Sequence, residues 1–263
     1  MKVLIKLGGT LLDASDSRHR LASEISSAVE QGVQVVVVHG GGKQMTRYLA
    51  DHGIQSRFVN GLRITTPEVL DAVVKVLAGS VNRDLVSAFI ACGAQAIGLT
   101  GMDALLTEAR QMSVELGWVG KPVRSDARLL NALIELKYVP VVACLAGDRT
   151  GQFYNVNADQ MAVSVAGALG VDKLLFLTDV EGVKGDNNVV YSTLNSDQCT
   201  QLMEGGVVTG GMRAKLEAAL EALQTGTAEV VIAPGASAGV VQKLLAGDSI
   251  GTRLVAHAEV PNA

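Results

Sequence analysis

Residues 33–42 read VQVVVVHGGG, a mostly β-branched run that ends in a histidine and three glycines. A run that is apolar on both faces is typical of a central strand in a parallel sheet. Glycines directly after such a strand favour a turn whose backbone N–H groups, with the start of the next helix, can bind an anion. This stretch therefore predicts an α/β protein with a ligand-binding turn at the carboxyl end of a strand.

Short apolar runs and longer segments of helical period alternate along the rest of the chain. This pattern is typical of proteins in which helices cover both faces of a sheet. We expect a three-layer αβα sandwich with a mostly parallel central sheet, in two lobes that meet near residues 155–170. The predicted strands are 3–7, 33–38, 95–99, 139–145, 173–177, 229–233 and 252–255; the predicted hairpins are 58–64, 107–119, 147–157 and one near 186–188; the predicted helices are 15–31, one that ends at 52, one that begins at 66–67, 126–137, 158–169, 195–204, 212–225 and a short one before the last strand.

The composition limits the class of protein. The 263 residues are 48% hydrophobic and 18% charged, as in a globular protein with a sizeable core. A net charge of −4 gives no electrostatic basis for binding nucleic acid or an anionic membrane. Three widely spaced cysteines predict neither a disulfide framework nor a zinc site. Lys6 interrupts the first apolar run too early for a signal peptide, and no run reaches the ~18 apolar residues of a membrane span. We expect a cytoplasmic protein.

Glycine clusters stand at three predicted strand-to-helix junctions, 8–9, 40–42 and 205–211. A single cluster is often only a turn or a helix cap. Three together favour a site for phosphate or carboxylate, because ligands of open α/β sheets lie at these junctions. The chain has neither the G-x-x-x-x-G-K-[ST] nor the G-x-G-x-x-G nucleotide motif, so the cations of such a site must come from elsewhere.

Two lysines and one aspartate are the candidates for charge at this site. Lys6 lies in an otherwise apolar strand, where an unpaired ammonium would be costly, so we expect an anion to face it. Lys215 lies one turn into the helix after the third glycine cluster and can reach back toward the start of that helix. Asp159 begins a predicted helix, where it could stabilise the helix dipole or hold both lysines in position.

Other polar side chains could contact a ligand. Asn155 and Asn157 lie before the helix of Asp159 and offer amide donors and acceptors, although asparagine is also common in turns. Arg63 lies in a hairpin marked by Asn60-Gly61 and could bind a carboxylate with its planar guanidinium, or simply be exposed.

A serine-hydrolase interpretation has two local matches. Residues 235–239 fit G-x-S-x-G and residues 39–42 fit H-G-G-G. The acid and histidine of a triad would have to be Asp248 and His257, in a tail too short for the intervening strands and helices. We therefore set this interpretation aside. The four histidines show no metal-ligand spacing, so no metal-binding residue is predicted.

Taken together, these segments resemble the amino acid kinase family and, within it, the enzymes that act on N-acetyl-L-glutamate. The resemblance covers nearly the whole chain, and its motifs follow the family order. They are residues 6–9 (KLGG), the opening strand and loop; 38–42 (VHGGG), the second glycine loop; 60–65 (NGLRIT), the substrate-clamping hairpin; 115–120 (ELGWVG), a further hairpin; 154–159 (YNVNAD), before the lobe junction; 179–183 (DVEGV), the nucleotide loop; and 210–212 (GGM) with Lys215, the final phosphate element.

The resemblance implies a carbamate kinase-like fold and transfer of the ATP γ-phosphoryl group to the side-chain carboxylate of N-acetyl-L-glutamate in arginine biosynthesis, with Mg²⁺ on the phosphates. Lys6 would stabilise the transferred phosphoryl group, Lys215 the leaving diphosphate, and Asp159 would orient both. The other implied contacts are Gly41, Gly42, Arg63 and Asn155 for acetylglutamate, and Gly8, Gly9, Asp179, Val180, Gly182, Lys184, Val207 and Thr209 for the nucleotide.

The resemblance also implies the organisation of the chain. A single amino acid kinase domain would span 1–263, with acetylglutamate binding and dimerisation in an N-terminal lobe (1–157) and ATP binding in a C-terminal lobe (158–263). Arginine-inhibited members carry an extra N-terminal helix that links dimers into a hexamer. Because the first strand begins at Val3, we expect a homodimer that is insensitive to arginine.

Two alternatives stay open. A kinase of carrier-protein-linked aminoadipate or glutamate in lysine biosynthesis should show a basic patch for an acidic carrier, and residues 107–125 contain no such run. A non-catalytic phosphate-binding module on the same fold would have no need of Lys6, Asp159 and Lys215 together.

Overall fold

The computed structural model of the protein describes residues 1–185 and 187–256. Two residues named above lie outside the described residues: Asp186, in the predicted hairpin near 186–188, and His257, weighed as a triad histidine. Lys184 and Val190, on either side of that hairpin, form an antiparallel bridge, as a hairpin requires.

An eight-stranded sheet forms the centre of the molecule, and six consecutive strands of it, which end at one edge, are parallel. β1 lies near the middle, with Lys6 in register with Val38 on one side and Phe176 on the other. Valine and leucine side chains bury these strands on both faces, as the apolar runs predict. In order across the sheet, the strands are β12 (Thr193–Asn195), β14 (Thr252–Val255), β13 (Glu229–Pro234), β11 (Lys173–Thr178), β1 (Lys2–Leu7), β2 (Gln34–His39), β8 (Val139–Ala143) and β5 (Ala96–Thr100).

Helices form a layer on each face of the sheet. One layer packs α1 (Ser15–Glu30) against α4 (Asn82–Ala91) and α9 (Val240–Ala246). The other contains α5 (Arg128–Glu135), α6 (Ala158–Leu169) and α8 (Gly210–Gln224), with α6 packed against α8. Because α1 and α6 connect strands in opposite directions across the sheet, right-handed crossovers place them on opposite faces. The predicted three-layer sandwich is confirmed.

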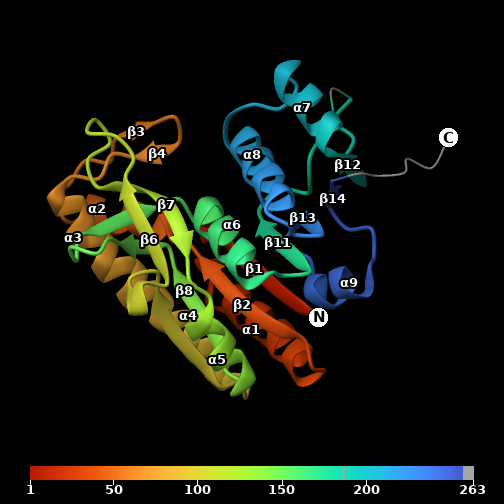
Figure 1. Ribbon diagram of the computed structural model, residues 1–263, viewed down its shortest axis with the longest axis horizontal. Coiled ribbons are helices and arrows are strands. Elements are labelled where there is room, and N and C mark those ends of the chain that lie inside the picture. Colours follow the sequence, from red (N-terminus) through yellow and green to blue (C-terminus); the bar gives the residue numbers. More distant parts are fainter. Residues whose placement is uncertain (186, 257–263) are drawn as a thin grey trace.

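Smaller elements surround the carboxyl ends of the strands (Figure 1). Figure 1 shows α6 in the middle, with β6, β7 and the β3–β4 hairpin on one side of it and α7 and α8 on the other. Asn60 and Gly61 both have positive φ, which confirms the tight hairpin that the Asn-Gly pair predicts. The remaining elements are η1 (Gly9–Leu12), α2 (Gly42–Asp51), β3 (Phe58–Val59), β4 (Leu62–Arg63), η3 (Asp103–Leu105), α7 (Ser196–Glu204), and a closed barrel of β6 (Thr107–Gln111), β7 (Val119–Ser125), β9 (Leu145–Gly147) and β10 (Phe153–Val156).

The helix that follows Thr66 is continuous but not uniform. Thr66 caps it by accepting a hydrogen bond from the Val69 amide at 3.4 Å, as predicted. α3 (Pro67–Val73) then continues through a π-helical segment, η2 (Val74–Val81), into α4. The spacing of apolar residues does not reveal the π-helical segment, because α-helical and π-helical turns both place apolar side chains against the core.

Three sequence-based expectations need correction. The glycine cluster at 205–211 follows the helix α7, which the sequence predicts at 195–204, and not a strand, since β12 ends ten positions before Gly205. The second strand of the hairpin expected at 107–119 is β7, which begins where that range ends and extends to Ser125. The strand expected at 139–145 is divided at Cys144, where the chain leaves the sheet (β8) and enters the barrel (β9).

Within 1–185 and 187–256, none of the helices has the length and apolar character that crossing a bilayer requires.

The motif at 235–239 serves to attach α9 to α1. The buried Glu24 carboxylate of α1 accepts hydrogen bonds from the amides of Gly239 at 2.9 Å and Val241 at 3.0 Å, at the start of α9. Arg20 forms an ion pair with Glu24 and donates to the carbonyls of Gly235 and Ser237. Ser237 thus lies in a loop that docks on α1, and the serine-hydrolase interpretation has no support in this arrangement.

Replacing Glu24 by alanine is expected to lower the free energy of unfolding by about 3 kcal/mol, because two amides of α9 and Arg20 lose their buried partner. Urea denaturation measures this. Glu30→Ala, an exposed position on the same helix, is the control and should change stability by less than about 0.5 kcal/mol. Equal losses in the two variants would contradict the assigned role of Glu24.

Candidate active site

Three segments distant in sequence meet at one carboxylate. The Lys6 Nζ lies 2.6 Å from Asp159 Oδ1, and the Lys215 Nζ lies 3.0 Å from Asp159 Oδ2. Lys6 comes from the carboxyl end of β1, Asp159 from the first turn of α6, and Lys215 from the second turn of α8. The predicted convergence of the two lysines on one acidic side chain is confirmed.

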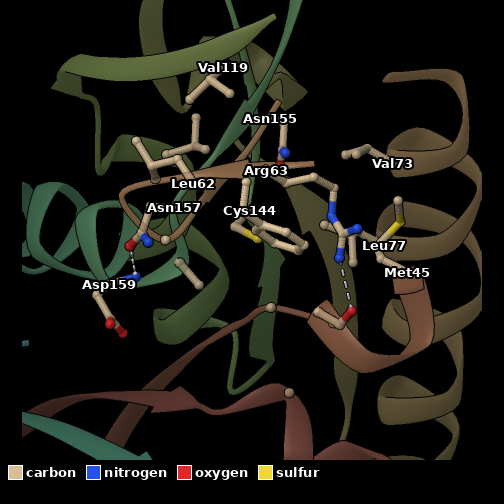
Figure 2. A pocket seen from close by; sticks show the side chains of 18 of the residues that line it. Met45, Leu62, Arg63, Val73, Leu77, Val119, Cys144, Asn155, Asn157 and Asp159 are labelled. Atoms are coloured by element: carbon tan, nitrogen blue, oxygen red, sulfur yellow. Dashed lines mark hydrogen bonds between the residues drawn. The ribbon is translucent and has the colours of Figure 1, made fainter. Parts of the chain in front are cut away.

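The start of α6 is held in place by its cap. The Asn157 side-chain oxygen accepts a hydrogen bond from the Asp159 amide at 2.9 Å (Figure 2) and another from the Gln160 amide at 3.2 Å. An asparagine cap satisfies amides that have no partner within the helix. Asn157 therefore fixes the turn that carries Asp159.

The charges of this trio do not balance. Burial alone would raise the pKa of Asp159, but Lys6 and then Lys215 hold it below its usual value, so the carboxylate stays ionised. Two ammonium groups against one carboxylate leave one positive charge in excess in a largely buried place. Such a place favours an additional anion, because a second negative charge would complete the pairing.

The first two glycine turns flank this trio. Gly9, Gly41 and Gly42 line the same cavity as Lys6 and Asp159. The two turns touch, since a Cβ on Gly9 would lie 3.0 Å from the Gly42 amide nitrogen. The Gly8 amide is engaged elsewhere, because it donates to the Leu177 carbonyl at 2.9 Å. The amides of Gly41 and Gly42 stand at the start of α2, where no acceptor exists within the helix.

The cavity has a volume of about 310 Å³ and two chemically different ends. Figure 2 shows Asp159 at one end and Arg63 at the other, with Asn155 beside Arg63. The end near Arg63 also has an apolar wall. The side chains of that wall are Met45, Leu62, Val73, Leu77, Val119 and Val156.

Arg63 is anchored on the hairpin but keeps donors for a ligand. Its guanidinium donates to the Thr46 hydroxyl at 2.9 Å, to the Gly42 carbonyl at 3.2 Å and to the Ser56 hydroxyl. Its Cζ lies 4.6 Å from the centroid of the Phe58 ring, a cation–π contact. Because a guanidinium has five N–H donors, these contacts hold it across the cavity without using all of them.

Asn155 is tied to the same hairpin through Thr65. The Asn155 side-chain amide donates to the Thr65 hydroxyl at 3.0 Å, and that hydroxyl donates to the Arg63 carbonyl at 2.8 Å. Thr65 is fully buried, and its backbone also pairs with residues 116–118. We assigned no role to Thr65 from sequence, and its side-chain partner Asn155, 90 residues away, leaves no local signal.

A second cavity, of about 650 Å³, lies beside the start of α8. Met212 lines it, and Lys215, one turn further on the same helix, lines the first cavity, so α8 borders both. Lys184 forms an ion pair with Glu181 at 2.8 Å at its edge. The predicted nucleotide residues found in this lining are Asp179, Val180, Gly182, Lys184, Val207 and Thr209.

Some lining residues were missed because they resemble core positions. Val73 and Leu77 are four residues apart and apolar, the pattern of a buried helix face, and Met45 follows the same pattern in α2. Cys144 also lines the cavity, and burial raises the pKa of its thiol to about 11, so it is a neutral wall residue. No signal in the sequence distinguishes these residues from core.

Among the residues that the structure describes, no group of three or more His, Cys, Asp or Glu side chains is placed to hold a metal ion. The donors around the first cavity are ammonium, guanidinium, amide and backbone N–H groups, which suit anions.

Comparison with known proteins supports this description. The sequence model of the "Amino acid kinase family" matches residues 1–234. The chain belongs to the amino acid kinase family. A curated family member from Solibacter usitatus (strain Ellin6076), named acetylglutamate kinase, is 56% identical over 97% of this chain and 99% of its own.

Solved structures agree on the fold of this family member. A crystal structure from Streptococcus mutans UA159 has a TM-score of 0.84 at 26% identity and covers 97% of this chain and 99% of its own. Carbamate kinase from Giardia lamblia, bound to AMP-PNP, has a TM-score of 0.69 at 17% identity, with 97% and 98% covered. The carbamate kinase-like fold is therefore confirmed.

Lys6→Ala and Lys215→Ala are each expected to lower kcat by ~10²–10³, because each removes a cation from a largely buried site. Steady-state kinetics at saturating substrates measure the change, and circular dichroism checks the fold. Lys173→Ala is the matched control, since that lysine also pairs with a carboxylate, Glu229 at 3.0 Å, but at the opposite end of the sheet. Near-normal kcat in folded Lys6 and Lys215 variants would refute the assignment.

Proposed function

We propose that this chain is an acetylglutamate kinase, which transfers the γ-phosphoryl group of ATP to the side-chain carboxylate of N-acetyl-L-glutamate and releases ADP. The product is an acyl phosphate, N-acetyl-L-glutamyl 5-phosphate, an intermediate of arginine biosynthesis. Curated relatives at 56%, 43% and 42% identity carry this name. The observation that carries the proposal for this chain is the cavity between Asp159 and Arg63.

The lining of this cavity favours an N-acylated substrate over a free amino acid. Arg63 and Asn155 can bind an α-carboxylate, and the apolar wall suits a neutral acyl group. Of the residues that line this cavity, Asp159 is the one with a carboxylate, and both of its oxygens already pair with Lys6 and Lys215. A free α-ammonium group would therefore be desolvated there without an anionic partner.

The reaction needs no general base, because a carboxylate is already a nucleophile. An oxygen of the substrate side chain attacks the γ-phosphorus, the bond from that phosphorus to the β,γ-bridging oxygen breaks, and its electrons leave on ADP. The obstacle is the approach of two anions. Catalysis then consists of alignment and charge neutralisation, which ammonium groups and backbone amides supply.

Each residue of the trio has a distinct task in this mechanism. Lys6 stabilises the phosphoryl group during transfer, and Lys215 stabilises the diphosphate that leaves. Asp159 orients both ammonium groups. The amides of Gly9, Gly41 and Gly42 donate to the reacting oxygens, as in an oxyanion hole. Gly8 supports the loop through its bond to Leu177.

The second cavity suits ATP as the phosphoryl donor. Its volume of about 650 Å³ is within the range of nucleotide-sized sites, and its position on α8 directs phosphates toward Lys215. Asp179, Val180, Gly182, Lys184, Val207 and Thr209 would hold the nucleotide. Mg²⁺, when bound to the phosphates, supplies further neutralisation of their charge. In this arrangement residues 1–157 bind the acceptor and residues 158–263 bind ATP, apart from the shared trio.

The test is an assay of ADP release with N-acetyl-L-glutamate, L-glutamate, L-aspartate and carbamate as acceptors. We expect turnover with N-acetyl-L-glutamate and at least about 10³-fold lower kcat/KM with glutamate, because its ammonium group has no partner. Hydroxylamine should trap the acyl phosphate as a hydroxamate. Comparable use of free glutamate or carbamate would contradict the proposal, and turnover of a carrier-linked acceptor alone would support the alternative in lysine biosynthesis.

We also propose a homodimer formed through the outer edge of the sheet. β5 is the outermost strand on that side, and Ile90 on the adjacent α4 is 59% exposed. An unpaired edge next to an exposed apolar side chain favours burial against a second copy. Light scattering of the wild-type protein should give the mass of two chains. The Ile90→Glu variant should give a mass closer to that of one chain. A monomeric wild-type protein would refute the dimer.

A further inference from the structure

His39 makes two hydrogen bonds inside the protein that the mechanism above does not use. It is the last residue of β2 and is fully buried. Its Nδ1 lies 2.9 Å from the Gly40 carbonyl oxygen, and its Nε2 lies 2.9 Å from the Asn82 side-chain nitrogen. Burial lowers the pKa of His39 to about 4, so the ring is neutral at physiological pH.

The partners of Asn82 determine which ring nitrogen carries the proton. The Asn82 side-chain nitrogen also lies 2.9 Å from the Val141 carbonyl oxygen, which can only accept, and its side-chain oxygen accepts from Arg83. The group that faces His39 is therefore the amide donor, and Nε2 must accept. Nδ1 then carries the hydrogen and donates it to the Gly40 carbonyl.

This hydrogen bond acts on the glycine turn of the active site. Gly40, Gly41 and Gly42 all line the cavity that contains Lys6 and Asp159. A Cβ on Gly40 would lie 3.4 Å from the Ala158 Cβ, next to Asp159, so the turn packs on the start of α6. A change in the Gly40 peptide would move the amides that follow it.

The π-helical segment η2 reaches the same turn. A Cβ on Gly41 would lie 2.5 Å from the Leu77 Cδ2 and 3.3 Å from the Val81 Cγ2, so both side chains press against the Gly41 backbone. Asn82 is the next residue after this segment. One stretch of helix therefore supplies both the apolar contact to Gly41 and the polar contact to His39. π-helical turns are frequent at functional sites.

We propose that Asn82 and His39 are positioning residues, which fix the Gly40 peptide so that the amides of Gly41 and Gly42 point at the phosphoryl group during transfer. Neither side chain touches the substrate in this role. The chain of contacts runs from the Val141 carbonyl through Asn82 and His39 to Gly40. This inference rests on the proposed function, because it assumes that the glycine turn donates to reacting oxygens.

The kinetic test compares Asn82→Leu, His39→Leu and His39→Asn. Both leucine variants should lower kcat by about tenfold or more at saturating substrates, since a small displacement of aligned groups is costly in rate. Asparagine at 39 offers an amide nitrogen where Nδ1 stood, so His39→Asn should retain a kcat about fivefold above that of His39→Leu. Ser26→Ala removes a buried hydroxyl that bonds Ala22 at 2.7 Å within α1, and it should leave kcat unchanged.

The outcomes separate the possible explanations. A purely structural role would lower the thermal midpoint of the leucine variants while the folded protein kept its kcat, and that result would overturn the proposal. Equal kcat in His39→Asn and His39→Leu would also overturn it. If the leucine variants fail to fold, ¹⁵N NMR of the wild-type histidines decides: the Nδ1–H tautomer of His39 supports the hydrogen-bond chain, and the Nε2–H tautomer refutes it. An inactive wild-type protein in the same assay would contradict the proposed function, while the NMR result would still test the geometry.

Discussion

The pairing of two lysines with one buried carboxylate is the interaction on which the site depends. Lys6 cannot remain in the apolar middle of a sheet without an anion, and Asp159 cannot remain ionised at the start of α6 without cations. The Lys6–Asp159 pair is neutral by itself, and Lys215 adds a positive charge that favours a further anion. The same contacts join β1, α6 and α8, so the trio that we propose to bind phosphate also holds these parts of the fold together.

The parallel sheet explains why these groups can meet. Strands β1, β2 and β11 end at one edge, and the turns that follow β1 and β2 touch through Gly9 and Gly42. The absence of side chains at these glycines lets two backbones approach a ligand from neighbouring strands. The third glycine cluster reaches the site by another route, because it follows a helix and contributes through α8. The proposed anion site therefore combines two strand-end turns with a lysine that lies on a helix.

The first cavity is supported by buried polar contacts between distant segments. Thr65 joins Asn155 to the hairpin of Arg63, and Asn82 joins the Val141 carbonyl to His39 and the glycine turn. Thr65, Asn155, Asn82 and His39 all form hydrogen bonds with other groups of the protein, so their side chains are nearly fixed in position. Rigid support of this kind suits a reaction that proceeds by alignment, since the protein has no proton transfer to perform.

Local patterns in the sequence were enough to predict most strands and helices, the Asn60-Gly61 hairpin and the need for an anion near Lys6, because these follow from side-chain periodicity, turn chemistry and the cost of a buried charge. Tertiary structure alone decided where the strand around Cys144 divides, and that Leu77 and Val81 contact the glycine turn while Asn82 bonds His39. Those outcomes depend on contacts between residues many tens of positions apart, and a pattern that repeats every two or four residues carries no record of them.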